Sequence, residues 1–199
     1  MTKDFYEVLA QRRSYYGLDK NIQVSEARIE EIINFAVKHT PSAFNSQSAR
    51  VAVLFHDKHD ELWHITTKAL RNVMGDNDFT ATQEKMDSFK AAYGTVLFFE
   101  DENIVKGLQE NFALYADNFP IWSHQASGMH QLVIWSGLEA EGLGASLQHY
   151  NPLIDSEVQS AFDIPANWKL VAQMPFGNPI AQPGEKAFED VANRVKVIR

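Results

Sequence analysis

The stretch WSHQASGMHQLVIWSGLEAEG, residues 122–142, decides how the rest of this chain must be arranged. If it is a helix, apolar side chains cover most of its circumference, namely Met129, Leu132, Val133, Ile134, Trp135 and Leu138. A helix of this kind must be buried nearly all round. We therefore expect it at the centre of the fold, with a subunit interface as a second place where its faces are covered.

Helices and short apolar strands flank this central helix in the sequence. Apolar spacing predicts helices over residues 2–11, 26–40, 57–73 and 158–162, and the more polar stretch 74–94 is predicted as a loop followed by a further helix. Ser25 is a suitable N-cap for the second helix, and Pro41 ends it. Short apolar or alternating runs predict strands over residues 51–56, 95–101, 144–150, 168–177 and 192–199. The pattern is α+β, without repeats or linkers, and predicts a single domain over residues 1–199.

Composition excludes several classes of function. With 199 residues, 45% of them hydrophobic, the chain is long enough to bury one substantial core. It carries 26 acidic and 18 basic residues, a net charge of −8, which argues against a nucleic-acid partner and against a membrane surface. There is no cysteine, so disulfides and thiolate chemistry are excluded. Without a secretory signal or a long apolar run, we expect a cytoplasmic protein that does not engage a membrane.

Common catalytic motifs are absent from the sequence. Neither a P-loop, nor the G-x-G-x-x-G fingerprint, nor a G-x-S-x-G nucleophile elbow occurs. His56, His59 and His64 lie close together, and could in principle bind a metal ion. No zincin motif accompanies them, so we interpret them as solvated surface histidines and expect no metal site.

Two polar segments are candidates for binding a ligand. Arg12, Arg13 and Ser14 combine two planar cations with a hydroxyl group, which suits a phosphate dianion. The alternative is that the arginines merely favour the end of the first helix electrostatically. The loop 42–47 follows Pro41 and offers hydroxyl and amide groups that can hydrogen-bond the edge of a planar heterocycle. The alternative here is an ordinary polar loop.

Four segments in order resemble the FMN-dependent nitroreductase family: RRSYY (12–16), PSAFNSQ (41–47), GLGASLQHYNP (142–152) and MPFGNP (174–179). The resemblance is strongest to the subgroup named after fatty-acid repression mutants, and covers residues 5–197. It implies an α+β nitroreductase-like fold, with a mainly antiparallel sheet surrounded by helices, in an intertwined homodimer that binds FMN at its interface. Many family members have an acidic residue and a glycine at the positions of Gln148 and His149, and proline at that of Ser48.

The resemblance assigns the binding residues one by one. Arg12, Arg13, Ser14 and Tyr16 would form the segment that binds the phosphate and ribityl chain, and Gln148 and His149 would lie at the face of the flavin ring. The loop beside the ring or ribityl chain would be formed by Ser42, Ala43, Phe44, Asn45 and Gln47. A basic residue near the C-terminus would reach the phosphate, with Lys186 as first choice and Arg194 as second. Residues 57–94 match the larger nitroreductase groups poorly, and Arg71 is the candidate for a ring contact from this range.

The resemblance implies that the protein is an FMN-dependent oxidoreductase, which takes a hydride from NAD(P)H and reduces nitroaromatics, quinones or similar acceptors in a ping-pong scheme. No catalytic side chain would be obligatory, because flavin N5 carries the chemistry. Aromatic residues would line the opening above the flavin, or alternatively pack in the core or a dimer interface: Phe112, Tyr115, Phe119 and Trp122. Two other readings stay open. One is a flavin-binding regulatory or redox-sensing protein with little turnover, and the other is a dimeric protein without a cofactor.

Overall fold

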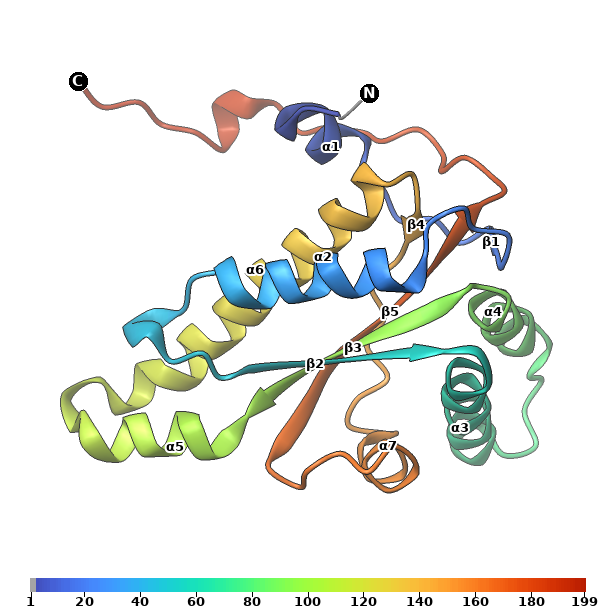
Figure 1. Cartoon of the computed structure of the whole chain (residues 1–199), viewed down its shortest axis with the longest axis horizontal. Helices are drawn as coiled ribbons and strands as arrows, with labels where there is room; N and C mark the ends of the chain where they lie inside the picture. The colour runs from blue at the N-terminus through green and yellow to red at the C-terminus, as the bar shows by residue number, and fades with distance from the viewer. Residues whose placement is uncertain (1–2) are drawn as a thin grey trace.

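A computed structural model describes residues 3–199 of the chain, in which helices enclose a central antiparallel sheet (Figure 1). Within this range the sheet has five strands in the order β1-β5-β3-β2, and β4 pairs with β5. The strands are β1 (Leu18–Asp19), β2 (Ala49–Phe55), β3 (Gly94–Asp101), β4 (Gly144–Ala145) and β5 (Trp168–Pro179). Every pairing between these strands is antiparallel.

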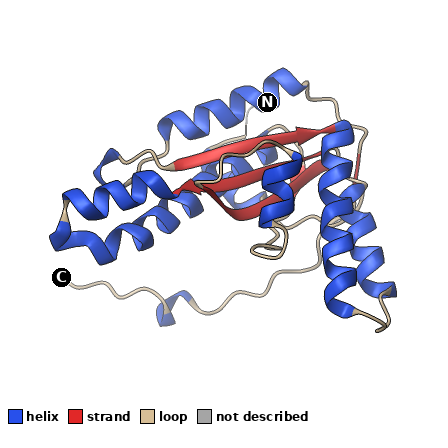
Figure 2. Cartoon of the chain, turned by 90° about the horizontal axis from the view of Figure 1, so that it is seen from below, coloured by secondary structure: helices blue, strands red, loops and turns tan. Residues whose placement is uncertain are grey.

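Helices lie on both faces of the sheet, as Figure 2 shows from another side. The α-helices are α1 (Phe5–Gln11), α2 (Glu26–His39), α3 (His56–Met74), α4 (Thr80–Lys90), α5 (Glu102–Asn111), α6 (Phe119–Ala140) and α7 (Asp155–Ala161). Three short 3₁₀ turns complete the list, η1 (Ala43–Asn45), η2 (Ala113–Asn118) and η3 (Val191–Asn193). Helix α2 begins as the sequence predicts, because the Ser25 hydroxyl caps it by accepting a hydrogen bond from the Arg28 amide at 3.2 Å.

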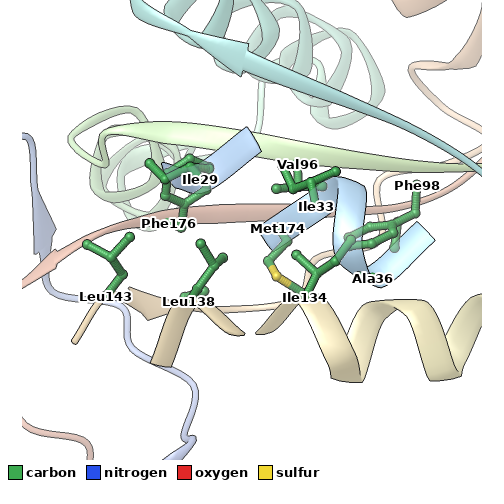
Figure 3. Packing of buried hydrophobic residues seen from close by; sticks show 12 residues of the cluster. Ile29, Ile33, Ala36, Val96, Phe98, Ile134, Leu138, Leu143, Met174 and Phe176 are labelled. Carbon is green, nitrogen blue, oxygen red and sulfur yellow. The ribbon is translucent and has the colours of Figure 1, made fainter. Parts of the chain in front are cut away.

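Strand β3 is buried at every position because both faces of the sheet are covered. Val96 and Phe98 face α2 and α6, where they pack against Ile33 and Ile134 in the cluster of Figure 3. The residues that alternate with them, Leu97 and Phe99, pack in a second cluster against α3, α4 and α7. The two clusters hold the sheet between two layers of helices, so the predicted α+β fold is confirmed.

The central helix differs from its prediction. Its core side is buried at Ile134 and Leu138, but Leu132 and Val133 on another side are 45% and 38% exposed. The expectation that this helix is buried nearly all round is therefore wrong for the single chain, whose other elements cover only part of its circumference.

Several local predictions also need correction. The alternating residues 192–199 form no strand, since the chain there makes the η3 turn and then runs exposed along the outside. The strand expected over 144–150 is shortened to Gly144–Ala145, followed by a single bridge at Gln148. Helix α5 was not predicted. The start of the first predicted helix, Thr2, lies outside the described residues.

His59 is not a surface histidine as predicted, but completely buried. Its Nδ1 lies 2.9 Å from the Thr95 hydroxyl and its Nε2 lies 3.1 Å from the Lys90 carbonyl oxygen. Burial lowers the pKa of His59 to about 4, so the ring is neutral at physiological pH. It is therefore a hydrogen-bonded part of the core, while His56 and His64 are exposed as predicted.

Candidate functional site

The segment after α1 presents a guanidinium group with unused hydrogen-bonding capacity. The guanidinium carbon of Arg12 lies 4.3 Å from the centre of the Trp135 ring on α6. Its Nε is buried, and finds no hydrogen-bond partner among residues 3–199. A buried donor without a partner is costly, and an anion bound at this position would satisfy it.

Strand β4 lies directly beside this segment. Ser14 forms a parallel bridge with Ala145, and the Tyr15 amide donates to the Ala145 carbonyl at 2.9 Å. Gly144 permits this close approach, because a Cβ there would lie 2.9 Å from side-chain atoms of Tyr15 and Leu18. The structure thus brings together two segments that are about 130 residues apart in the sequence.

Gln148 and His149 follow β4 and differ in their surroundings. The main chain of Gln148 exchanges two hydrogen bonds with Gln173 of β5, at 2.7 and 2.9 Å, and its side-chain amide donates to Ser146 Oγ at 3.1 Å. Gln148 is therefore buried and fixed, whereas His149 is exposed. The two residues lie at the end of the segment that Ser14 contacts.

The remaining basic candidates lie on the exposed C-terminal segment. Arg13 donates from Nη2 to the Gly184 carbonyl at 2.6 Å, which ties the segment 12–14 to the chain two residues before Lys186. Lys186 is exposed, and its ammonium lies 5.0 Å from the ring centre of Phe188. Arg194 caps the η3 turn and is also exposed.

Two further candidates lie on other segments. Tyr16, just after the segment 12–14, is exposed. The guanidinium carbon of Arg71 lies 3.7 Å from the centre of the Phe79 ring.

The loop 42–47 has a strained backbone. Phe44, Asn45 and Gln47 have positive φ values of 56°, 50° and 48°. A left-handed conformation is uncommon for a residue other than glycine, and three in one short loop must be held by surrounding contacts. One such contact is the Gln47 amide, which donates to the Ser42 hydroxyl at 3.0 Å. Strain of this kind is typical of functional loops.

Phe44 is the centre of an aromatic cluster at the start of α6. Its ring lies between 4.9 and 6.0 Å, centre to centre, from four other rings, those of Phe112, Tyr115, Phe119 and Trp122. Phe119 is buried, while Phe44, Phe112 and Tyr115 are each at least 40% exposed. The four aromatics selected from the sequence therefore do come together, around a fifth ring from the strained loop.

The segment after α1, which contains Arg12, and the loop 42–47 lie at opposite ends of α6, as the path of the chain in Figure 1 shows. Arg12 lies against Trp135 near the end of the helix, and Phe44 lies against Trp122 near its beginning. Trp135 follows Trp122 by 13 positions along the helix, which corresponds to about 20 Å along the axis. A single chain does not bring the loop 42–47 to Arg12.

A buried polar network that was missed from the sequence anchors the loop. Glu100 at the end of β3 is only 3% exposed, and its Oε2 accepts a hydrogen bond from Ser48 Oγ at 2.6 Å. Burial raises the pKa of Glu100 to about 7, opposed by the Ser48 hydrogen bond and the positive charge of Arg50. The sequence signal was a glutamate that continues the apolar run TVLFF without a break.

Comparison with known proteins agrees with this geometry. Residues 9–178 match the sequence model described as the nitroreductase family. The chain is 48% identical to the nitroreductase CinD from Lactococcus lactis in complex with nicotinic acid, with a TM-score of 0.92 over 98% of this chain and all of that one. It is 34% identical to HBN1 of Saccharomyces cerevisiae, over 97% of this chain and 96% of HBN1. A protein from Desulfovibrio desulfuricans, determined in complex with FMN, shares the fold with a TM-score of 0.71. It is 20% identical to this chain, and the match covers all of this chain and 99% of that one.

The protein belongs to the nitroreductase family. It is therefore an oxidoreductase, and the resemblance inferred from its four sequence segments is confirmed. Within residues 3–199, no helix is long and apolar enough to cross a membrane.

Proposed function

We propose that this protein is an FMN-dependent oxidoreductase that takes reducing equivalents from NAD(P)H and passes them to nitroaromatics, quinones or related acceptors. The observation that carries the proposal is the buried Nε of Arg12, which has no hydrogen-bond partner among the described residues and so fits an anionic cofactor group. Support for the acceptor class comes from CinD, which is 47% identical and has been determined in complex with chloramphenicol and with 4-nitrophenol. Residues 1–199 would act as a single domain, in the cytoplasm.

The chain's residues would divide the work of holding FMN. Arg12 and Ser14 would bind the phosphate, with Lys186 or Arg194 as a further cation from the C-terminal segment. Gln148 would meet the ring with a side chain already fixed by its hydrogen bond to Ser146. Because this side chain is buried and held before the cofactor binds, little conformational entropy is lost on binding.

When bound, FMN would supply the hydride chemistry, accepting at N5 from NAD(P)H and later reducing the acceptor. The protein would contribute position and electrostatics. Cationic Arg12 would balance the negative charge of the cofactor, and Phe44 and its neighbouring rings would give an apolar wall that keeps water from the bound acceptor.

A homodimer would complete the site. An antiparallel pairing of two α6 helices would bring the loop 42–47 of one protomer to the Arg12 end of the other, which a single chain cannot do. An apolar groove of about 600 Å³ between α2 and α6 supports this arrangement, because it leaves Phe35 and Val133 exposed. The same pairing would cover the apolar side of α6 that is open in the single chain.

The first experiment is the visible spectrum of the purified protein with added FMN, before and after anaerobic NADH. Bound flavin that bleaches with NADH and recovers with 4-nitrophenol or a quinone, with continued NADH consumption, supports the oxidoreductase. A single reduction without turnover would favour the sensing role, and no flavin binding would favour a protein without cofactor.

Replacing Arg12 tests the anion site directly. Arg12→Ala should weaken FMN binding by about 2–3 kcal/mol, roughly a 30- to 140-fold higher Kd, because a charged hydrogen bond is lost. Lys68→Ala serves as the control, since it removes a positive charge from the exposed surface of α3. Titration of flavin fluorescence measures both. Equal Kd values for Arg12→Ala and the unchanged protein would contradict the assignment.

A further inference from the structure

Ser48 joins the strained loop to the end of the sheet. Its hydroxyl donates to Glu100 Oε2 at 2.6 Å, and its carbonyl accepts from the Asp101 amide at 2.9 Å. Ser48 is buried and directly follows Gln47, the last residue of the loop with a positive φ. The position of Gln47 therefore depends on what holds Ser48.

Arg50 holds the same end of the loop from the other side. Its guanidinium donates to the Gln47 carbonyl at 2.8 Å and to Asp101 Oδ2 at 2.9 Å. The loop is thus attached to the sheet at two successive residues, Gln47 through Arg50 and Ser48 through Glu100. Of the two partners, Glu100 is the one whose charge changes near neutral pH.

Glu100 can exchange a proton with solvent although it is buried. It lines a cavity of about 140 Å³ between β3, α5 and the start of α6, and its Oε1 has no partner anywhere in residues 3–199. A space of this size has room for water molecules, which would hydrogen-bond Oε1 and carry protons, and polar side chains that include Gln109 and Ser123 are among its lining residues. Charged and titratable groups surround Glu100 from every neighbouring element: Arg50 on β2, Asp101 on β3, Lys169 on β5, Glu102 and Lys106 on α5, and His124 on α6.

We propose that Glu100, acting through Ser48, is a positioning residue that holds the loop 42–47 more firmly when its carboxyl group is ionised than when it is protonated. This inference rests on the proposed function, in which that loop contacts FMN. The raised pKa of Glu100, about 7, places the change in the physiological range. A carboxylate accepts the Ser48 hydrogen bond more strongly than a neutral carboxyl does, so protonation loosens the loop.

Proton binding to Glu100 and FMN binding are linked, and this linkage sets the direction in which pH changes the affinity for FMN. Because the ordered loop favours ionised Glu100, FMN binding should favour it too, and affinity should fall as the pH falls through 7. We expect about a threefold higher Kd at pH 6 than at pH 8; full protonation would give about fivefold, the difference between a hydrogen bond to a charged and to a neutral acceptor.

The test compares the unchanged protein with Glu100→Gln, Ser48→Ala and the control Glu102→Gln at pH 6 and pH 8. Glu102 lines the same cavity but lies 3.7 Å from Lys106 instead of contacting Ser48. Two quantities are measured: the Kd for FMN, and hydrogen exchange of the amides of residues 45–47 without added FMN, corrected for the intrinsic effect of pH. The exchange measurement does not depend on the proposed function.

We expect faster exchange at pH 6 than at pH 8 in the unchanged protein and in Glu102→Gln, and no such difference in Glu100→Gln or Ser48→Ala. The Kd should follow the same pattern. If exchange behaves so but no FMN binds at any pH, the proposed function fails and the positioning role stands. If the unchanged protein shows no pH dependence, or Glu100→Gln retains it, the positioning role is overturned.

Discussion

Replacing Glu100 with glutamine should make the protein more stable at neutral pH. A carboxyl group whose pKa rises on folding binds protons more tightly in the folded state, so stability is present at low pH and lost as the pH rises. The rise from 4.5 to about 7 corresponds to about 3 kcal/mol, at about 1.4 kcal/mol per pKa unit. Glutamine has the shape of the protonated form and cannot ionise, so it should retain this stability at pH 8.

His59 affects stability with the opposite sign over an overlapping range. Its pKa falls from 6.5 to about 4 on folding, so the unfolded chain takes up a proton that the folded chain does not, and stability is lost as the pH falls through this range. The two effects oppose each other between about pH 4.5 and 6.5. We therefore expect a nearly flat stability profile in the unchanged protein, and a profile that falls towards acid in Glu100→Gln.

The measurement is urea unfolding followed by circular dichroism at pH 5, 6, 7 and 8, at one protein concentration because an oligomer's stability depends on it. The difference between Glu100→Gln and the unchanged protein should grow with pH to about 3 kcal/mol at pH 8. Glu102→Gln should differ by no more than about 0.5 kcal/mol throughout. A variant less stable than the unchanged protein at pH 8, or a difference that does not vary with pH, would refute the reasoning.

Three further predictions concern the core and the interface. Ile134→Ala removes a fully buried side chain between α6 and the sheet and should cost about 2–5 kcal/mol of stability in urea unfolding, whereas a cost under 1 kcal/mol would contradict the packing. Val133→Glu places a charge in the apolar groove and should shift the protein to a monomer in size-exclusion chromatography, with loss of FMN binding; an unchanged elution volume would place the interface elsewhere. His59→Gln should lower stability at pH 7 through lost packing, but it removes the titration that offsets that of Glu100, so its stability relative to the unchanged protein should rise by about 3 kcal/mol between pH 6.5 and 4, as urea unfolding at those two pH values would show.

A raised pKa and backbone strain occur together at the same loop. Ionised Glu100 costs stability at neutral pH, and three residues of the loop 42–47 have positive φ values. Natural proteins keep such costs where function requires them. For this reason we include Glu100 and Ser48 in the proposed functional site.

The sequence by itself determined the features that depend on neighbouring residues. Ser25 and the spacing of Ile29, Ile32 and Ile33 define α2, because capping and apolar periodicity act within a few residues. The apolar run at residues 95–101 predicts the strand β3. Four short segments in order were sufficient to indicate the family.

Only the tertiary structure decided the features that depend on distant residues. His59 is buried because Thr95 and Lys90, more than 30 residues away, offer it hydrogen bonds. Residues 192–199 alternate like a strand, yet a strand needs another strand's backbone groups, and the described chain pairs them with none. The separation of Arg12 from the loop 42–47 likewise follows from the length and position of α6. Local pattern sets the preference of a segment for helix or strand, whereas its burial, strand pairing and hydrogen-bond partners depend on what the fold places beside it.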